Sequence, residues 1–165
     1  MSHPALSDLD FEINATRRLL ECIPDDKLEW KPHEKSWTLG ELATHIANLF
    51  AWQKGILQMD EFNLNSIGAP DAGLNSKDEI IVRFDSYVEE LNKRLNTMEV
   101  SDFEKVWTLK NGERVVNKQP KLAAFRTTCI SHLIHHRGQL TVYLRLLDIP
   151  LPPTYGPTAD EQVSW

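Results

Sequence analysis

Hydrophobic residues recur every three or four positions in four long segments of this chain, which is the spacing of amphipathic α-helices. The predicted helices cover about residues 5–22, 39–58, 77–97 and 120–147. Polar residues take the outer side of these segments. Because each helix has only one apolar face to bury, the pattern predicts an all-α protein, a four-helix bundle.

Local signals mark where the two middle helices begin. Thr38 and Glu41 have the spacing of a capping box, with Ser36 as the alternative cap. Ser76 and Glu79 repeat the same spacing before the third helix. Prolines are expected to stop the first and the last helix.

The remaining segments predict a hairpin, a loop and an extended tail. Residues 106–116 alternate on both sides of Asn111-Gly112, which predicts a small β-hairpin with a type I′ turn, inserted between helices three and four. Residues 60–75 are rich in Asn, Gly, Pro and Ser and predict a long loop of the kind that often lies near a site. The proline-rich stretch 150–157 predicts an extended segment laid over the bundle.

One face of the last predicted helix carries two histidines. The residues on that face are Phe125, Cys129, His132, His136, Leu140, Tyr143 and Leu147. His132 and His136 are four residues apart, so their imidazoles project side by side and form a two-point clamp for a metal ion. The alternative is a pair of packed core histidines, but burying both leaves four ring nitrogens to satisfy, each costing roughly 1–3 kcal/mol if unpaired.

The second helix contributes a third inward histidine, His45, between Leu42 and Leu49. Three histidines leave at least one coordination position open, whereas structural zinc sites are normally closed by four protein ligands. A metal ion there could lower the pKa of a bound water or activate a thiolate. Imidazole ligands suit zinc, nickel, copper and iron, so the ligand set does not choose among these metals.

Two neighbours of the histidine pair are further candidates. His135 lies about 100° around the helix from His136 and could serve as a general base, with a structural or surface role as the alternative. Gln139, one turn later, could hydrogen-bond a ligand. No glutamate lies between His132 and His136, so the base of the His-Glu-x-x-His peptidases is missing. Arg137 is expected on the outer side of the helix or in a partner interface.

Composition narrows the function mainly by exclusion. The 165 residues suffice for one domain, residues 1–165, and the net charge of −6 without a basic block argues against nucleic-acid binding. No apolar run approaches the ~18 residues that cross a bilayer, and no secretory signal is visible, so we expect a cytoplasmic protein that does not bind membranes. Cys22 and Cys129 are expected to be free thiols, the latter near the histidine site.

Three segments, residues 39–47, 132–145 and 152–161, resemble the DinB-like (DinB/YfiT-type) family. The resemblance covers nearly the whole chain, and the His-Arg-Gly-Gln run beginning at His136 is fairly specific when paired with the upstream His45. It implies a four-helix bundle with up-down-down-up connections and a divalent ion, usually zinc or nickel, held by His45, His132 and His136. It also implies a homodimer and relatives that include thiol transferases and metal-dependent hydrolases.

We therefore predict a divalent-metal-binding protein that acts as an enzyme on a small-molecule substrate. It would be a hydrolase acting through a metal-bound water, or a thiol S-transferase acting through the metal-bound thiolate of a low-molecular-weight thiol. His135 and Gln139 are the candidate catalytic residues. One alternative is a non-catalytic metal-binding or stress-response module in which the ion mainly stabilises the bundle. The other is a metal-free bundle with packed histidines.

Overall fold

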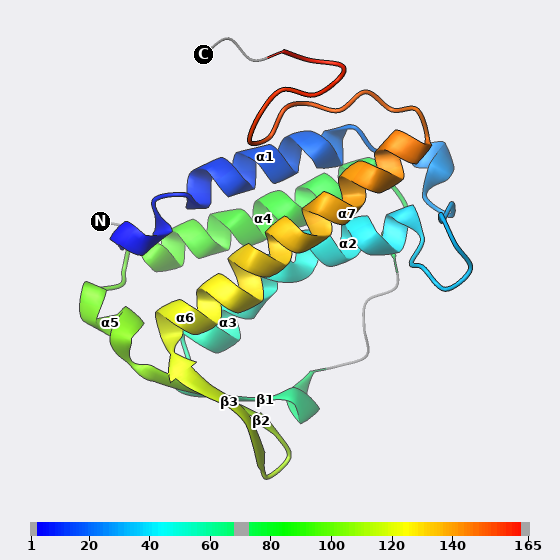
Figure 1. The fold of residues 1–165 in the computed structure, drawn as a ribbon. Helices are drawn as coiled ribbons and strands as arrows, with labels where there is room; N and C mark the ends of the chain where they lie inside the picture. The colour runs from blue at the N-terminus through cyan, green and yellow to red at the C-terminus, as the bar shows by residue number, and fades with distance from the viewer. Residues whose placement is uncertain (1–2, 68–72, 163–165) are drawn as a thin grey trace.

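The computed structural model describes residues 3–67 and 73–162, and over these the chain is mostly helical with one small sheet (Figure 1). The helices are α1 (Leu9–Glu21), α2 (Leu39–Asn48), α3 (Trp52–Leu57), α4 (Lys77–Leu95), α5 (Val100–Glu104), α6 (Lys121–Phe125) and α7 (His132–Leu146). The strands are β1 (Glu61–Asn63), β2 (Val106–Asn111) and β3 (Arg114–Pro120). None of the described helices is long and apolar enough to cross a membrane.

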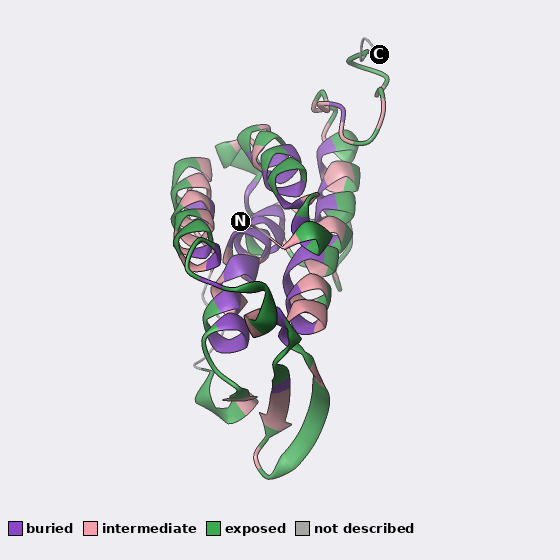
Figure 2. Cartoon of the chain, turned by 90° about the vertical axis from the view of Figure 1, so that its left-hand side faces the viewer, coloured by how far each residue is buried: buried purple, intermediate pink, exposed green. Residues whose placement is uncertain are grey.

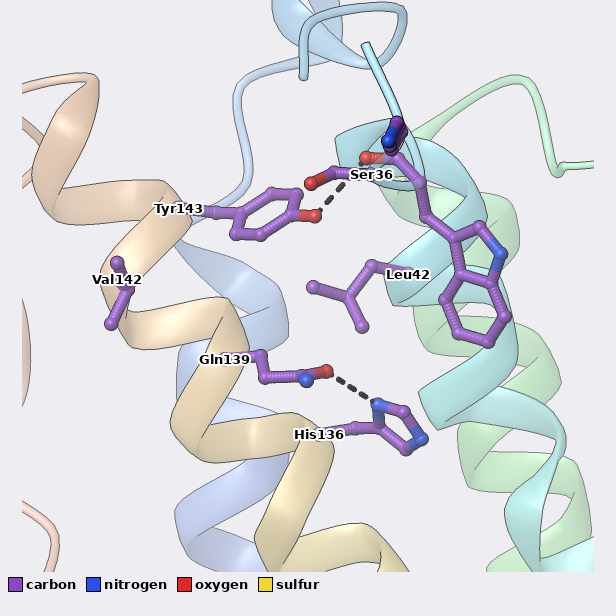
Figure 3. A pocket seen from close by; sticks show the side chains of 8 residues that line it. Ser36, Leu42, His136, Gln139, Val142 and Tyr143 are labelled. Carbon is purple, nitrogen blue, oxygen red and sulfur yellow. Dashed lines mark hydrogen bonds between the residues drawn. The ribbon is translucent and has the colours of Figure 1, made fainter. Parts of the chain in front are cut away.

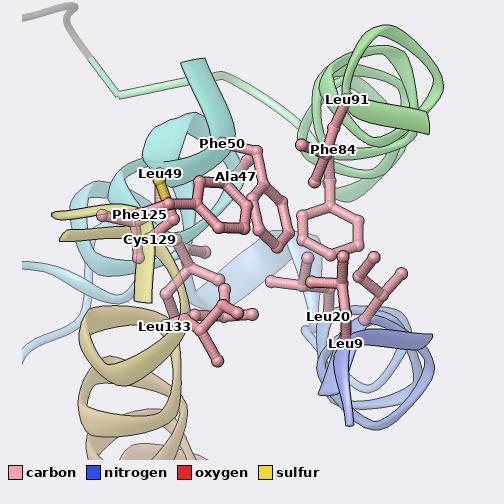
Figure 4. Close-up of a cluster of buried hydrophobic side chains, with 14 of the residues drawn as sticks. Leu9, Leu20, Ala47, Leu49, Phe50, Phe84, Leu91, Phe125, Cys129 and Leu133 are labelled. Carbon is pink, nitrogen blue, oxygen red and sulfur yellow. The ribbon is translucent and has the colours of Figure 1, made fainter. Parts of the chain in front are cut away.

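The four longest helices, α1, α2, α4 and α7, pack around a common core (Figures 1 and 4). α1 contacts α4 and α7, and α2 contacts the same two helices. Phe50 is central to this core, with its ring centroid 6.0 Å from that of Phe84 and 6.4 Å from that of Phe125. Buried residues line the inner faces of the helices, while the hairpin is mostly exposed (Figure 2). The helical packing agrees with the prediction, and the up-down-down-up connection order stays a prediction.

Both predicted helix starts are confirmed. The Thr38 hydroxyl accepts the amide of Glu41 at 3.1 Å, and the Glu41 carboxylate accepts the amide of Thr38 at 2.7 Å. Ser76 caps α4 by accepting the amide of Glu79 at 3.2 Å. The predicted continuous helix over residues 39–58 is wrong, because a 3-10 turn, η3 (Leu49–Ala51), separates α2 from α3.

The hairpin exists, but it belongs to a three-stranded sheet in the order β1-β2-β3. The parallel strand β1, within the predicted loop, was missed because three residues are too few to show alternation. The type I′ turn is also wrong. The two residues between the strands are Gly112 and Glu113, and of these only Gly112 has a positive φ, +58°. A type I′ turn requires positive φ at both central positions, whereas type II′ places glycine at the first.

The last predicted helix is interrupted by a π-helical turn. The chain leaves β3 at Pro120, forms α6, passes through the π turn η5 (Arg126–Ser131) and continues as α7. A π turn shifts the helix phase, since its hydrogen bonds reach one residue further than those of an α-helix. In α7 the fully buried positions are consequently Leu133, Leu140 and Leu144, and the two histidines lie at the edge of this line.

Arg137 lies inside the protein, and its predicted position on the outer side or in a partner interface is wrong. One guanidinium nitrogen lies 2.6 Å from the Glu12 carboxylate, and the two side chains are only 3% and 4% exposed. The same guanidinium donates to the Tyr155 hydroxyl at 2.7 Å, and that hydroxyl donates to Glu12 at 2.8 Å. The buried side of α7 therefore contacts two helices. His136 lies on the part that faces α2, and Arg137 lies on the part that faces α1.

The tail after α7 is extended and lies over the helices, as predicted (Figure 1). Arg18 of α1 donates to the backbone carbonyl of Pro153 at 2.5 Å. Arg145 of α7 forms an ion pair with Asp160. Together with Tyr155, these contacts attach the tail to both α1 and α7.

Candidate metal centre

Three histidines from two helices converge at one point. His45 comes from the last turn of α2, while His132 and His136 come from the start of α7. Nε2 of His132 lies 2.9 Å from Nε2 of His136 and 3.5 Å from Nε2 of His45. One donor atom from each of the three rings lies within 4.8 Å of the others. The structure therefore brings together the three residues that the sequence singled out as candidate ligands.

These separations fit one shared ion. Zn–N bonds of 2.0–2.1 Å at tetrahedral angles place two ligand nitrogens about 3.3 Å apart. The observed separations of 2.9 and 3.5 Å bracket that value. Small rotations of the rings would bring three nitrogens into one coordination sphere, so the cluster fits a divalent ion.

The protons on two of the rings point away from the cluster. Nδ1 of His136 lies 2.7 Å from Oε1 of Gln139, which only accepts, so in the neutral ring the proton is on Nδ1. His132 hydrogen-bonds the backbone of Thr128, which raises the pKa of His132 and therefore uses a ring N–H. Since Nε2 of His132 faces the other histidines, this proton too is on Nδ1. With both rings in these tautomers, two Nε2 lone pairs face each other at 2.9 Å. A cation removes this repulsion.

The π turn contributes directly to this arrangement. Thr128 lies within η5, one turn before His132. π turns inside α-helices free backbone groups from the regular pattern and are frequent at functional sites. Here the backbone of Thr128 supports the first histidine of α7. The sequence contains no signal for this turn, because the apolar spacing continues through it.

Burial keeps the three imidazoles neutral. It lowers the pKa of His132 and of His136, and neighbouring imidazoles lower both further. Burial, helped by the other two histidines, lowers the pKa of His45 to about 4. At neutral pH all three rings are therefore in the unprotonated form that binds metal ions.

Two further candidates lie next to the cluster in different roles. Gln139 is exposed and orients His136. His135 is exposed, with its ring centroid 4.8 Å from that of His136, and it contributes no atom to the cluster. Its role as a general base stays a prediction. Cys129 is fully buried in the core, and burial raises the pKa of its thiol, so it serves as a packed hydrophobe.

A pocket of about 460 Å³ opens beside His136 (Figure 3). Its lining residues are Lys35, Ser36, Trp37, Leu42, His136, Gln139, Val142 and Tyr143. Trp37 covers the cluster, with its ring centroid 4.9 Å from that of His45 and 5.7 Å from that of His136. Sequence reasoning missed Trp37 because it lies in a polar connector without periodicity. The only available signal was its place just before the Thr38 cap.

The hydrogen bond from His136 to Gln139 predicts a measurable contribution to metal binding. We expect Gln139→Ala to weaken zinc affinity about 10–100-fold, the usual effect of removing the partner of a ligating histidine. Gln139→Glu keeps an acceptor and should stay close to wild type. Competition with a chromophoric chelator measures both. Equal affinities for Gln139→Ala and wild type would show that this contact does not support the site.

Known proteins resemble this chain both in sequence and in fold. A model described as the DinB family matches residues 1–163. The Bacillus subtilis protein YrdA, described as uncharacterized, is 27% identical over 159 residues, covering 94% of this chain and 89% of that protein. A DinB-like protein from Bacillus cereus superposes with a TM-score of 0.70 at 23% identity, covering 92% of this chain and 95% of that one. A DinB-like protein from Bacillus subtilis, YjoA, gives 0.69 at 23% identity, covering 98% of this chain and all of that one.

Proposed function

This chain belongs to the DinB family, and we propose that it is a metal-dependent enzyme whose divalent ion, zinc or nickel, is held by His45, His132 and His136. The observation that carries the proposal is the convergence of three imidazoles, with Nε2 of His132 2.9 Å from Nε2 of His136 and 3.5 Å from Nε2 of His45. Three protein ligands leave a position for a substrate. That position would adjoin the pocket that His136 lines.

The protein's own residues would bind and orient the reactants. When bound, the ion would supply Lewis-acid chemistry that lowers the pKa of a water or a thiol, as a hydrolase or a thiol S-transferase requires. Gln139 would hold His136 in the tautomer that binds metal. Trp37 would shield the cluster from water on one side. His135, beside His136 and exposed, would move protons.

Elemental analysis combined with a substrate panel tests this proposal. Protein purified without a histidine tag should contain about one zinc or nickel ion per chain. Chelation should abolish turnover of aryl esters or conjugation of small thiols, and reloading should restore it. If the protein holds no metal even after reconstitution, the proposal is wrong.

A non-catalytic metal module is the second candidate, because the ligands come from two different helices. An ion bound by His45 and His132 would cross-link α2 to α7, although the two residues are 87 positions apart in the sequence. This function would be favoured if chelation lowered the melting temperature while no substrate of either class turned over.

The predicted homodimer remains part of the proposal. Sedimentation analysis of the purified protein measures its oligomeric state.

The lowered pKa values predict unusual tolerance of acid. Three histidines with ordinary pKa values of about 6.5 would lose about 50-fold in metal affinity between pH 7.5 and 6.0, because protons compete for the ligands. The pKa values of all three ligands are lowered here, that of His45 to about 4. Competition begins only at lower pH, and removing His45 alone from it already reduces the expected loss to less than about 15-fold over this interval. Zinc titrations at both pH values measure it, and a 50-fold loss would contradict the prediction.

A further inference from the structure

The pocket beside the candidate metal centre joins aromatic walls to a single positive charge. We infer that it binds a small anionic molecule with a flat apolar body, whose negative group lies at Lys35 and whose metal-binding atom reaches the three histidines. This inference rests on the proposed function and adds the class of substrate. The walls, the charge and the floor of the pocket support it separately.

The walls suit a planar, apolar group. Leu42 of α2 and Val142 of α7 line the pocket, so much of its surface is aliphatic (Figure 3). The indole of Trp37 is inclined by only 27° to the ring of His136. Tyr143 donates its hydroxyl proton to the backbone carbonyl of Trp37 at 3.1 Å and so attaches the connector to α7. Aromatic side chains held in place favour stacking with a flat ligand.

The charge of the pocket favours an anion. Lys35 is the one charged side chain among its eight lining residues, although the chain as a whole has a net charge of −6. Lys35 forms no ion pair with the residues that the structure describes. Its ammonium group is therefore available to a ligand. A divalent ion held in part by His136, which lines the pocket, would add positive charge on that side, so Lys35 and the ion would both attract a negative molecule.

The floor of the pocket offers a hydrogen-bond donor. Gln139 uses Oε1 to accept the proton of His136, so its NH₂ group remains to donate (Figure 3). This donor suits an oxygen of the ligand near the metal. The volume of about 460 Å³ lies within the range typical of small-molecule sites and is far too small for a folded partner.

Three probes with the same metal-binding group test the inference in zinc-loaded protein. The probes are benzohydroxamate, its 4-carboxy derivative and its 4-aminomethyl derivative, titrated by calorimetry. We expect the carboxylate to bind about 10-fold tighter than the neutral parent, and the amine about 10-fold weaker. Trp37→Ala should weaken all three about 10-fold, since the indole forms one wall.

Two lysine variants distinguish the charge of Lys35 in the pocket from the general effect of removing one positive charge from the connector. Lys35→Ala should reduce the preference for the carboxylate to within about 2-fold of the neutral probe. Lys31→Ala is the matched control, because Lys31 lies in the same connector, donates to the carbonyl of Glu34 and does not line the pocket. This control should keep the full preference.

The outcomes distinguish this inference from the proposed function. Zinc content is measured in every sample. If the protein holds zinc but binds the three probes equally, or if both lysine variants behave alike, the inference is wrong while the metal site stands. If the protein holds neither zinc nor nickel even after reconstitution, the proposed function fails and the inference fails with it.

Discussion

His132→Ala is expected to lose its metal, falling from about one ion per chain to below about 0.1 under the same purification. His132 is the central ligand of the cluster, since its Nε2 approaches both His45 and His136. Two histidines on different helices would remain, which is too few to hold an ion through dialysis. The loss should exceed the 10–100-fold effect of removing only a supporting partner. Elemental analysis of tag-free protein measures it.

Two other histidines provide the controls. The exposed side chain of His33 accepts the amide of Lys35 and contributes no atom to the cluster, so His33→Ala should retain the full metal content. His135→Ala should retain it too, because His135 contributes no atom to the cluster. The assignment is wrong if His135→Ala empties the site while His132→Ala leaves it filled. Without metal, His132→Ala should be as stable as wild type or more so, because it removes one of two facing lone pairs.

Arg137→Ala is expected to destabilise the protein by about 3–5 kcal/mol, because it leaves the carboxylate of Glu12 buried without its charge partner. Both side chains are almost fully buried, and they join α7 to α1. For a chain of this size, that loss corresponds to a fall in melting temperature of about 10 °C or more. Urea denaturation of the metal-free protein measures the effect apart from metal binding.

Companion variants separate the ion pair from simple packing. Glu12→Leu combined with Arg137→Met removes both charges and keeps apolar volume, so it should cost much less than Arg137→Ala alone. Tyr155→Phe removes only the hydroxyl that bridges the pair and should cost about 1 kcal/mol. If Arg137→Ala costs less than about 1 kcal/mol, the pair does not join the two helices energetically.

Helix periodicity was sufficient to select the candidate site. His45, His132 and His136 were chosen from spacing and from their apolar neighbours, and the structure brings all three together. The capping residues Thr38 and Ser76 were equally predictable from the sequence, because a helix cap is an interaction between residues three positions apart. Metal binding itself stays a prediction that the experiments above will decide.

The errors share a physical cause. Strand β1, which the sequence did not predict, forms by pairing with β2, some 45 residues later in the chain. Its own three residues show no alternation of polar and apolar positions. The turn of the hairpin shifted by one residue because Gly112, and not Asn111, takes the positive φ. The π turn is invisible in a spacing that tolerates steps of three or four residues.

By itself, the sequence determined the four long helical segments, the caps of two of them and the pair of histidines one turn apart, because these depend on neighbours within about four residues. Only the tertiary structure decided which way the outer residues of α7 face. Arg137 is buried because Glu12, 125 positions away, supplies its counter-charge. Trp37 covers the histidines because Tyr143 attaches its connector to α7. A local pattern records which residues can be buried, whereas the partner that makes burial of a charge favourable comes from a distant segment.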